Sequence, residues 1–254
     1  MDKSGALEQP IGRITSGIQT GTLILKTIDF VQQHLSAWRD DPDRPEKLSE
    51  PSLNQQLVKF LDSRARNDFP MVRFDHEEQE PKRRSVDFSA SPSPFEAMVI
   101  GERLHTIYDP FLVFECKRLP PPPSKDREIE YVTGGKNNKS GGIQRFKLGL
   151  HGAKLNMVGM IGYVQERSTG DWYRQINSWI SELASGVRED CCMWKDSEQL
   201  QEFNGDERSG IANCRSVHDR IGYVSSSELI IHHLWVAMNL KKTQKNSVIN
   251  KAGK

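Results

Sequence analysis

The sequence is organised around one stretch, Pro110-Phe111-Leu112-Val113-Phe114-Glu115-Cys116-Lys117-Arg118-Leu119. It begins as an apolar run typical of a strand and ends with a carboxylate and an ammonium two residues apart. Because successive side chains of a strand alternate between its faces, Glu115 and Lys117 share one face. The prolines at 120–123 cannot continue an inner ladder, so we expect the chain to leave the sheet there. The stretch predicts either a surface ion pair or a metal site with a lysine beside it.

The composition is that of an ordinary soluble protein. The chain has 254 residues, 27% of them charged and 36% hydrophobic, with a formal net charge of +1. A polyanion site must therefore be local. No apolar run approaches the ~18 residues of a membrane span and no signal-like segment begins the chain, so we expect a cytoplasmic protein without a membrane partner. The four cysteines contain no C-x-x-C, which argues against a disulfide framework and a zinc knuckle.

Two helices are expected first. Apolar residues at helical spacing predict one from about Thr20 to Trp38, with residues 40–45 as a linker. The second starts near Ser52 and ends at 67–70. We interpret residues 1–45 as an N-terminal helical extension, 46–240 as the main domain and 241–254 as a polar tail.

Extended segments follow at 71–74 and 85–89, and the charged block 75–84 between them is interpreted as a solvated turn. The run 95–108 is ambiguous between helix and strand. Residues 124–142 are interpreted as a mobile loop, 143–150 as a short helix and 157–164 as a strand buried on both faces. A helix from Asp171 and extended segments at 211–220 and 229–238 complete the pattern. The order predicts an α/β fold with a mixed central sheet flanked by helices.

A hard cation such as Mg²⁺ needs a second carboxylate near Glu115. Asp109 lies six residues earlier, about 20 Å away in an extended chain, and cannot share the ion. Asp87 lies in another extended segment, and it comes within reach if the two strands are neighbours at the ~4.8 Å strand spacing. We therefore select Asp87. Lys117 would then act as a fixed cation beside attacking water or scissile phosphate.

This constellation resembles the PD-(D/E)xK nuclease superfamily. The resemblance covers roughly residues 50–164 and is carried by Val86-Asp87-Phe88, by Phe114-Glu115-Cys116-Lys117 and by the helix starting Gly142-Ile143-Gln144-Arg145-Phe146. It implies a restriction endonuclease-like core and Mg²⁺-dependent hydrolysis of DNA phosphodiester bonds, with Mn²⁺ as a substitute cofactor. Restriction, repair and phage defence are the settings that it implies.

The resemblance also assigns roles to residues of this chain. Asp87, Glu115 and the backbone carbonyl of Cys116 resemble the metal ligands, and Lys117 resembles the catalytic lysine. Glu50 is similar in position to an additional acidic residue of some members. Gln144 and Arg145 match helix positions that orient the lysine or contact phosphate. The chain departs from the pattern because no proline precedes Asp87 and about twenty-seven residues separate Asp87 from Glu115.

Two other groups of polar residues each allow two interpretations. The glycine-rich loop holding Lys136 and Lys139 fails the phosphate-loop pattern, since neither lysine lies between Gly and Ser or Thr. It is either a surface for a nucleic-acid backbone or a disordered connection. Ser216, His218 and Arg220 share one strand face, as a substrate patch or as a structural hydrogen-bonded cluster.

Two functions follow from the sequence. The first is a metal-dependent nuclease acting on DNA. The second is a non-catalytic module that binds nucleic acid or a protein, with Glu115 and Lys117 as a simple ion pair. A metal requirement separates them. A homo-oligomer and a separate partner protein are both compatible with the sequence.

Overall fold

The computed structural model describes residues 22–80, 84–93, 97–100, 103–122, 125–220, 222 and 224–239. The predicted polar tail at 241–254 lies outside these residues. The elements in chain order are α1 (Thr22–Arg39), α2 (Glu50–Asp68), β1 (Val72–Glu80), β2 (Arg84–Pro92), β3 (Met98–Ile100), β4 (Arg103–His105), β5 (Leu112–Leu119), η1 (Lys125–Tyr131), α3 (Gly142–Lys147), β6 (Met157–Val164), α4 (Thr169–Ala184), η2 (Asp196–Glu198), β7 (Gln201–Asp206), β8 (Ile211–Asp219) and β9 (Glu228–Ala237). Within the described residues, no helix has the length and apolar character needed to cross a membrane.

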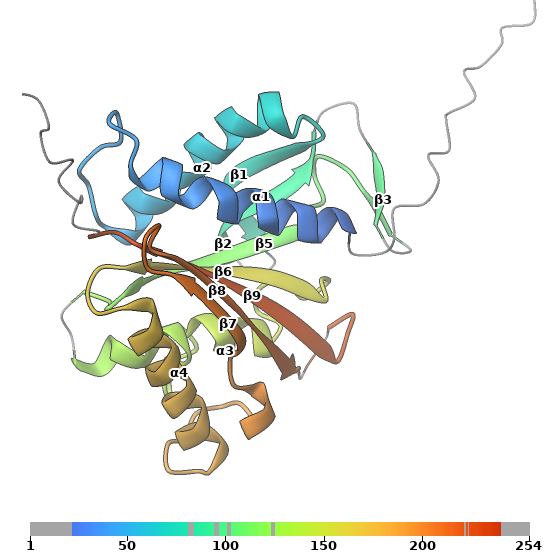
Figure 1. Ribbon diagram of the computed structural model, residues 1–254. Helices are drawn as coiled ribbons and strands as arrows, with labels where there is room; N and C mark the ends of the chain where they lie inside the picture. The colour runs from blue at the N-terminus through green and yellow to red at the C-terminus, as the bar shows by residue number, and fades with distance from the viewer. Residues whose placement is uncertain are drawn as a thin grey trace, which may run out of the picture.

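A mixed sheet of seven strands forms the centre, in the order β1-β2-β5-β6-β9-β8-β7. The three middle strands β5, β6 and β9 run parallel, and the outer pairs are antiparallel. Helices α1 and α2 cover one face of the sheet, whereas α3 and α4 lie on the other (Figure 1). The predicted α/β fold with a mixed sheet flanked by helices is confirmed.

Each face of the sheet has its own hydrophobic cluster. The predicted apolar stripe of α1 is buried together with α2 and with Leu112 and Phe114 of β5. The other cluster joins Val113 and Leu119 of β5 to α3, β6 and α4. The α1 helix, which the sequence placed in an extension, thus packs directly on the sheet.

The predicted turn at 75–84 is wrong for residues 75–80 and for Arg84, which lie in strands, whereas residues 81–83 lie outside the described residues. Strand β1 continues to Glu80, and its pairing with β2 extends to Glu80 opposite Arg84. Because β1 is the edge strand of the sheet, charged residues along it do not have to enter the core.

The structure also settles two connecting regions. The ambiguous run 95–108 contains the short antiparallel pair β3 and β4. The predicted mobile loop 124–142 begins with the 3₁₀ helix η1, and its residues Tyr131 and Val132 are buried. Apolar residues at 129–132 therefore anchor the end of η1 in the core, where the sequence predicts a loop. The sequence did not predict β7 or η2.

Replacing two glycines by alanine should change the free energy of unfolding in opposite directions, because one lies against the core and the other has open space around it. A Cβ at Gly159 of β6 would overlap the ring of Phe114, whereas at Gly170 of α4 the nearest other atom is 3.8 Å away. We expect Gly159→Ala to lower the free energy of unfolding by about 1–3 kcal/mol. Gly170→Ala should raise it by about 0.5–1 kcal/mol, because alanine favours the helix. Urea denaturation checks both, and a neutral Gly159→Ala would contradict the packing described.

Candidate functional site

Strands β2 and β5 separate at the point where the predicted acids lie. Their antiparallel pairing reaches Phe88 and Phe114 and stops one residue before Asp87 and Glu115. Phe88 is buried in the cluster under α1 and α2, but Val86 is buried in the cluster on the opposite face. Since residues two apart in a regular strand share a face, β2 changes course at Asp87.

Beyond this point, two carboxylates replace the missing strand partner. The backbone N–H of Cys116 donates to Asp87 Oδ2 at 2.7 Å, and that of Arg118 donates to Glu50 Oε2 at 3.0 Å. Glu50 reaches the strand from the first turn of α2. The buried donors of β5 are therefore satisfied by charged side chains instead of by a ladder.

Glu115 lies at the centre, with an exposed fraction of 1%. Lys117 Nζ is 2.9 Å and Arg145 Nη1 2.6 Å from its Oε1 atom. His151 Nδ1 is 3.0 Å from Oε2. Lys117 Nζ also lies 3.3 Å from Glu50 Oε1, which joins the acids into one group. We call this group the Glu115 cluster; it consists of Glu50, Asp87, Glu115, Lys117, Arg145 and His151.

Of the two residues predicted on α3, one joins the cluster and the other does not. Arg145 contacts Glu115, whereas Gln144 Oε1 accepts from the backbone N–H of Gly134 and its Nε2 donates to Asp190. Successive side chains of a helix point about 100° apart, so the two neighbours face different elements. Gln144 therefore holds the loop after η1 and does not orient Lys117 in this position, and its predicted contact to phosphate stays a prediction.

His151 was missed by the sequence analysis. The chain leaves α3 through Gly149 and Gly152, whose φ angles of 60° and 57° lie in the left-handed region that favours glycine. These turns return His151 to the sheet beneath Glu115. A histidine between glycines carries no periodic signal, so only the flanking pattern Gly-Leu-His-Gly could have suggested a fixed turn.

The acids of the cluster have opposite electrostatic environments. Burial and the charge of Glu115 raise the pKa of the Asp87 carboxyl from 3.8 to about 7, against the opposing effect of Lys117. Burial also disfavours the Glu115 carboxylate, but the charges of Lys117, His151 and Arg145 outweigh it and hold the pKa of Glu115 below its usual range. Two acids with separated pKa values are typical of functional sites.

The donor set fits a hard divalent cation. Asp87, Glu115 and the carbonyl of Cys116 supply oxygen atoms, and the crowded negative charge that raises the Asp87 pKa favours a cation there. Within the described residues, no three His, Cys, Asp or Glu side chains are arranged to hold a metal ion. A cation at Asp87 and Glu115 would complete its shell with water, as Mg²⁺ commonly does.

The predicted nucleic-acid lysines lie on the surface of the loop after η1. Lys136 and Lys139 are exposed, and Lys136 Nζ pairs with Glu189 Oε2 at 2.8 Å. Neither lysine forms a hydrogen bond or ion pair with the Glu115 cluster in the described part of the chain. Their role in nucleic-acid contact stays a prediction.

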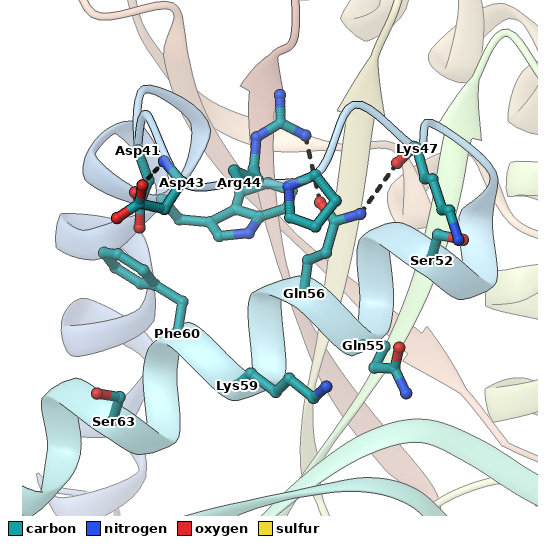
Figure 2. Close-up of a pocket in the computed structure, with 12 residues that line it drawn as sticks. Asp41, Asp43, Arg44, Lys47, Ser52, Gln55, Gln56, Lys59, Phe60 and Ser63 are labelled. Atoms are coloured by element: carbon teal, nitrogen blue, oxygen red, sulfur yellow. Dashed lines mark hydrogen bonds between the residues drawn. The ribbon is translucent and has the colours of Figure 1, made fainter.

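A surface pocket lies beside α2, outside the Glu115 cluster. Its walls are the segment after α1 and one side of α2, and the labelled residues Lys47, Ser52 and Gln55 flank the start of that helix (Figure 2). Gln56 Nε2 donates to the backbone carbonyl of Lys47 at 3.1 Å, which ties the segment after α1 to α2. None of the predicted site residues lines it.

A second polar group lies fully inside the protein. We call it the buried polar chain; its members are Lys147, Glu198, His218, Ser216, His233 and Tyr131. Lys147 Nζ is 2.6 Å from Glu198 Oε1, and His218 Nδ1 is 3.5 Å from Glu198 Oε2. Ser216 Oγ lies 2.7 Å from His218 Nε2 and 2.8 Å from His233 Nε2. The structural reading of Ser216 and His218 is therefore confirmed, and Arg220 instead binds the carbonyls of Leu155 and Gly152.

The hydrogen bonds of this chain run in one direction. Trp235 Nε1 donates to Tyr131 Oη, and the arrangement that gives this hydroxyl proton an acceptor has it donate to His233 Nδ1. His233 then carries its proton on Nε2 and donates to Ser216, which donates to His218. Burial lowers the pKa of His218, and it lowers that of His233 further, with help from His218 and His232. Both histidines are therefore neutral at physiological pH.

The order serine, histidine, glutamate resembles a nucleophilic triad. However, Ser216 is 1% exposed and also bonds His233, so substrate cannot reach its hydroxyl. The buried polar chain is structural.

No protein-family model, curated protein or solved structure matches this chain.

Replacing Asp87 by asparagine should stabilise the protein. The raised pKa means that the native state binds a proton more readily than the unfolded state between about pH 4 and 7, so ionised Asp87 costs stability above pH 7. Asparagine keeps an acceptor for Cys116 without the charge. We expect Asp87→Asn to raise the free energy of unfolding at pH 8 by about 1–3 kcal/mol in metal-free urea denaturation. Exposed Asp68→Asn is the control, and a destabilised Asp87→Asn would contradict this electrostatic picture.

His233 should make stability depend on pH. The pKa of His233 is depressed in the native state, so below about pH 6.5 the unfolded state takes up a proton that the native state excludes. The free energy of unfolding therefore falls as the pH is lowered. His233→Gln should lower stability at pH 8 by about 1–3 kcal/mol through lost hydrogen bonds. It should also flatten the decline between about pH 5 and 6.5 by up to about 1.4 kcal/mol per pH unit. Chemical denaturation across this range tests it, with part-exposed His76→Gln as control; an unchanged slope would overturn the assignment.

Proposed function

We propose that this protein is a metal-dependent nuclease of the PD-(D/E)xK type that hydrolyses DNA phosphodiester bonds. The observation that carries the proposal is the meeting of Asp87, Glu115 and Lys117 where β2 and β5 separate. Three residues chosen from strand spacing and resemblance thus occupy one site, with Glu50 beside them.

The order of elements supports the restriction endonuclease-like core. Helix α2 precedes the strand of Asp87, β5 carries Glu115 and Lys117, and α3 follows before β6, which pairs parallel to β5. This is the succession of helix, acid-bearing strands, helix and strand on which the resemblance rests.

Each residue has a chemical role in the proposal. Asp87, Glu115 and the Cys116 carbonyl would hold Mg²⁺, or Mn²⁺ in its place, and the ion would supply Lewis-acid activation of water. Burial lowers the pKa of Lys117, but Glu115 and Glu50 outweigh burial and raise it above its usual range. Lys117 therefore stays protonated and acts as a fixed cation that stabilises negative charge on the reacting phosphate, not as a base. Glu50 positions the ammonium group of Lys117.

DNA is the substrate that the resemblance implies, in restriction or phage defence. Arg145 and, farther along the surface, Lys136 and Lys139 are the proposed contacts to its backbone. Guanidinium and ammonium groups neutralise phosphates, so their contribution should weaken with salt.

One observation favours the alternative, a non-catalytic module that binds nucleic acid or protein. Each carboxylate of the Glu115 cluster already has a partner within the chain: Asp87 and Glu50 accept backbone N–H groups, and Glu115 accepts from three side chains. An ion-pair group that only stabilises the strand ends would look similar. It would not need metal.

Cleavage of DNA separates the two functions. Plasmid, single-stranded DNA and RNA are incubated with Mg²⁺, Mn²⁺ or EDTA. We expect metal-dependent DNA cleavage that falls by at least about 100-fold in Lys117→Met and in Asp87→Asn, because each removes a group needed in the transition state. Exposed Lys195→Met is the matched control. Cleavage that survives in EDTA, or that is equal in both variants and the wild type, would reject this site, and absence of cleavage with every metal would favour the binding module.

A further inference from the structure

Arg145 differs from the other donors to Glu115 in its exposure. The side chain of Arg145 is 29% exposed, against 9% for Lys117 and 3% for His151. Lys117 is further held by Glu50 at 3.3 Å, and the His151 ring packs edge-on against Phe146 with a centroid distance of 6.2 Å. Of these three donors, Arg145 is therefore the one that can leave Glu115 without opening the core.

Of the two carboxylate oxygens of Glu115, Oε1 is the one that is fully occupied. Oε1 receives both Lys117 and Arg145, and Oε2 receives His151. A metal ligand must offer a free lone pair, and both lone pairs of Oε1 are taken while Lys117 and Arg145 stay, so a cation can bind Oε1 only when one of these two donors leaves. A departing Arg145 would free Oε1.

The charge balance of the Glu115 cluster also favours the exchange of Arg145 for a divalent cation. Leaving His151 aside, the three carboxylates of the Glu115 cluster face two permanent cations, Lys117 and Arg145. One negative charge is therefore uncompensated in the metal-free cluster. Exchanging Arg145 for a divalent cation removes that imbalance.

We infer that Arg145 is an exchangeable cation: it neutralises Glu115 in the metal-free protein, leaves when a divalent cation binds, and then contacts a phosphate of the nucleic acid. The inference rests on the proposed function and deepens it. A guanidinium suits both positions, because its planar donors pair with carboxylate and phosphate in the same geometry. Metal binding would thus be coupled to presentation of a substrate contact.

The test measures metal affinity and cleavage separately. If Arg145 competes with metal for Glu115, its removal must tighten metal binding. We expect Arg145→Met and Arg145→Gln to bind Mn²⁺ about five-fold or more tightly than the wild type by isothermal titration calorimetry without DNA. Cleavage at saturating metal should fall by about ten-fold or more, because a phosphate contact is lost. A merely structural Arg145 would lower both quantities together.

Arg118→Met is the matched control, since it removes one positive charge from the same strand as Glu115 without removing a contact to that carboxylate. Its Mn²⁺ affinity should change by less than about two-fold. The exchange would be overturned, with the metal site left intact, if the wild type binds Mn²⁺, Asp87→Asn does not, and both Arg145 variants bind it no more tightly than the wild type. Absence of Mn²⁺ binding in the wild type and in the Arg145 variants would instead overturn the proposed nuclease and the exchange with it.

Discussion

Two backbone N–H groups near the end of β5, those of Cys116 and Arg118, constrain the whole Glu115 cluster. A buried donor without a partner costs about 1–3 kcal/mol, and the separation of β2 from β5 removes the carbonyls that a ladder would supply. Asp87 and Glu50 take that place. These two carboxylates then lie close to the buried carboxylate of Glu115, so their negative charges need a cation between them. Lys117 supplies that cation, with its ammonium near both Glu50 and Glu115.

The sequence predicted those parts of the site that follow from strand periodicity. Glu115 and Lys117 share a face because they are two residues apart, and Asp87 was found because a second carboxylate had to come from a neighbouring strand. His151 could not be predicted, because its position depends on two left-handed turns after α3. Gln144 was assigned to the lysine or to a phosphate although its side chain bonds the loop after η1, since the sequence does not show how a short helix is rotated.

The same physical limits explain the errors in the fold. Long apolar runs such as β6 and the periodic helices α1 and α4 were predicted because burial leaves a strong pattern. The block 75–84 was misread because charge indicates solvent exposure, and an edge strand is exposed as readily as a turn. The 3₁₀ helix η1 was not predicted within the segment 124–142, because its apolar run at 129–132 is too short to show a helical period.

The residue at position 87 has more charge than its hydrogen bond to the backbone requires. Accepting the Cys116 N–H requires one oxygen, and a neutral amide would supply it without the charge repulsion that raises the Asp87 pKa. In the buried polar chain, by contrast, each histidine is kept neutral and the acid Glu198 is paired with Lys147. No charge in the buried polar chain is therefore left without an opposite charge beside it. Asp87 is partly exposed and carries a charge that accepting the Cys116 N–H does not require; in the proposed nuclease, a bound cation would be the partner of this charge.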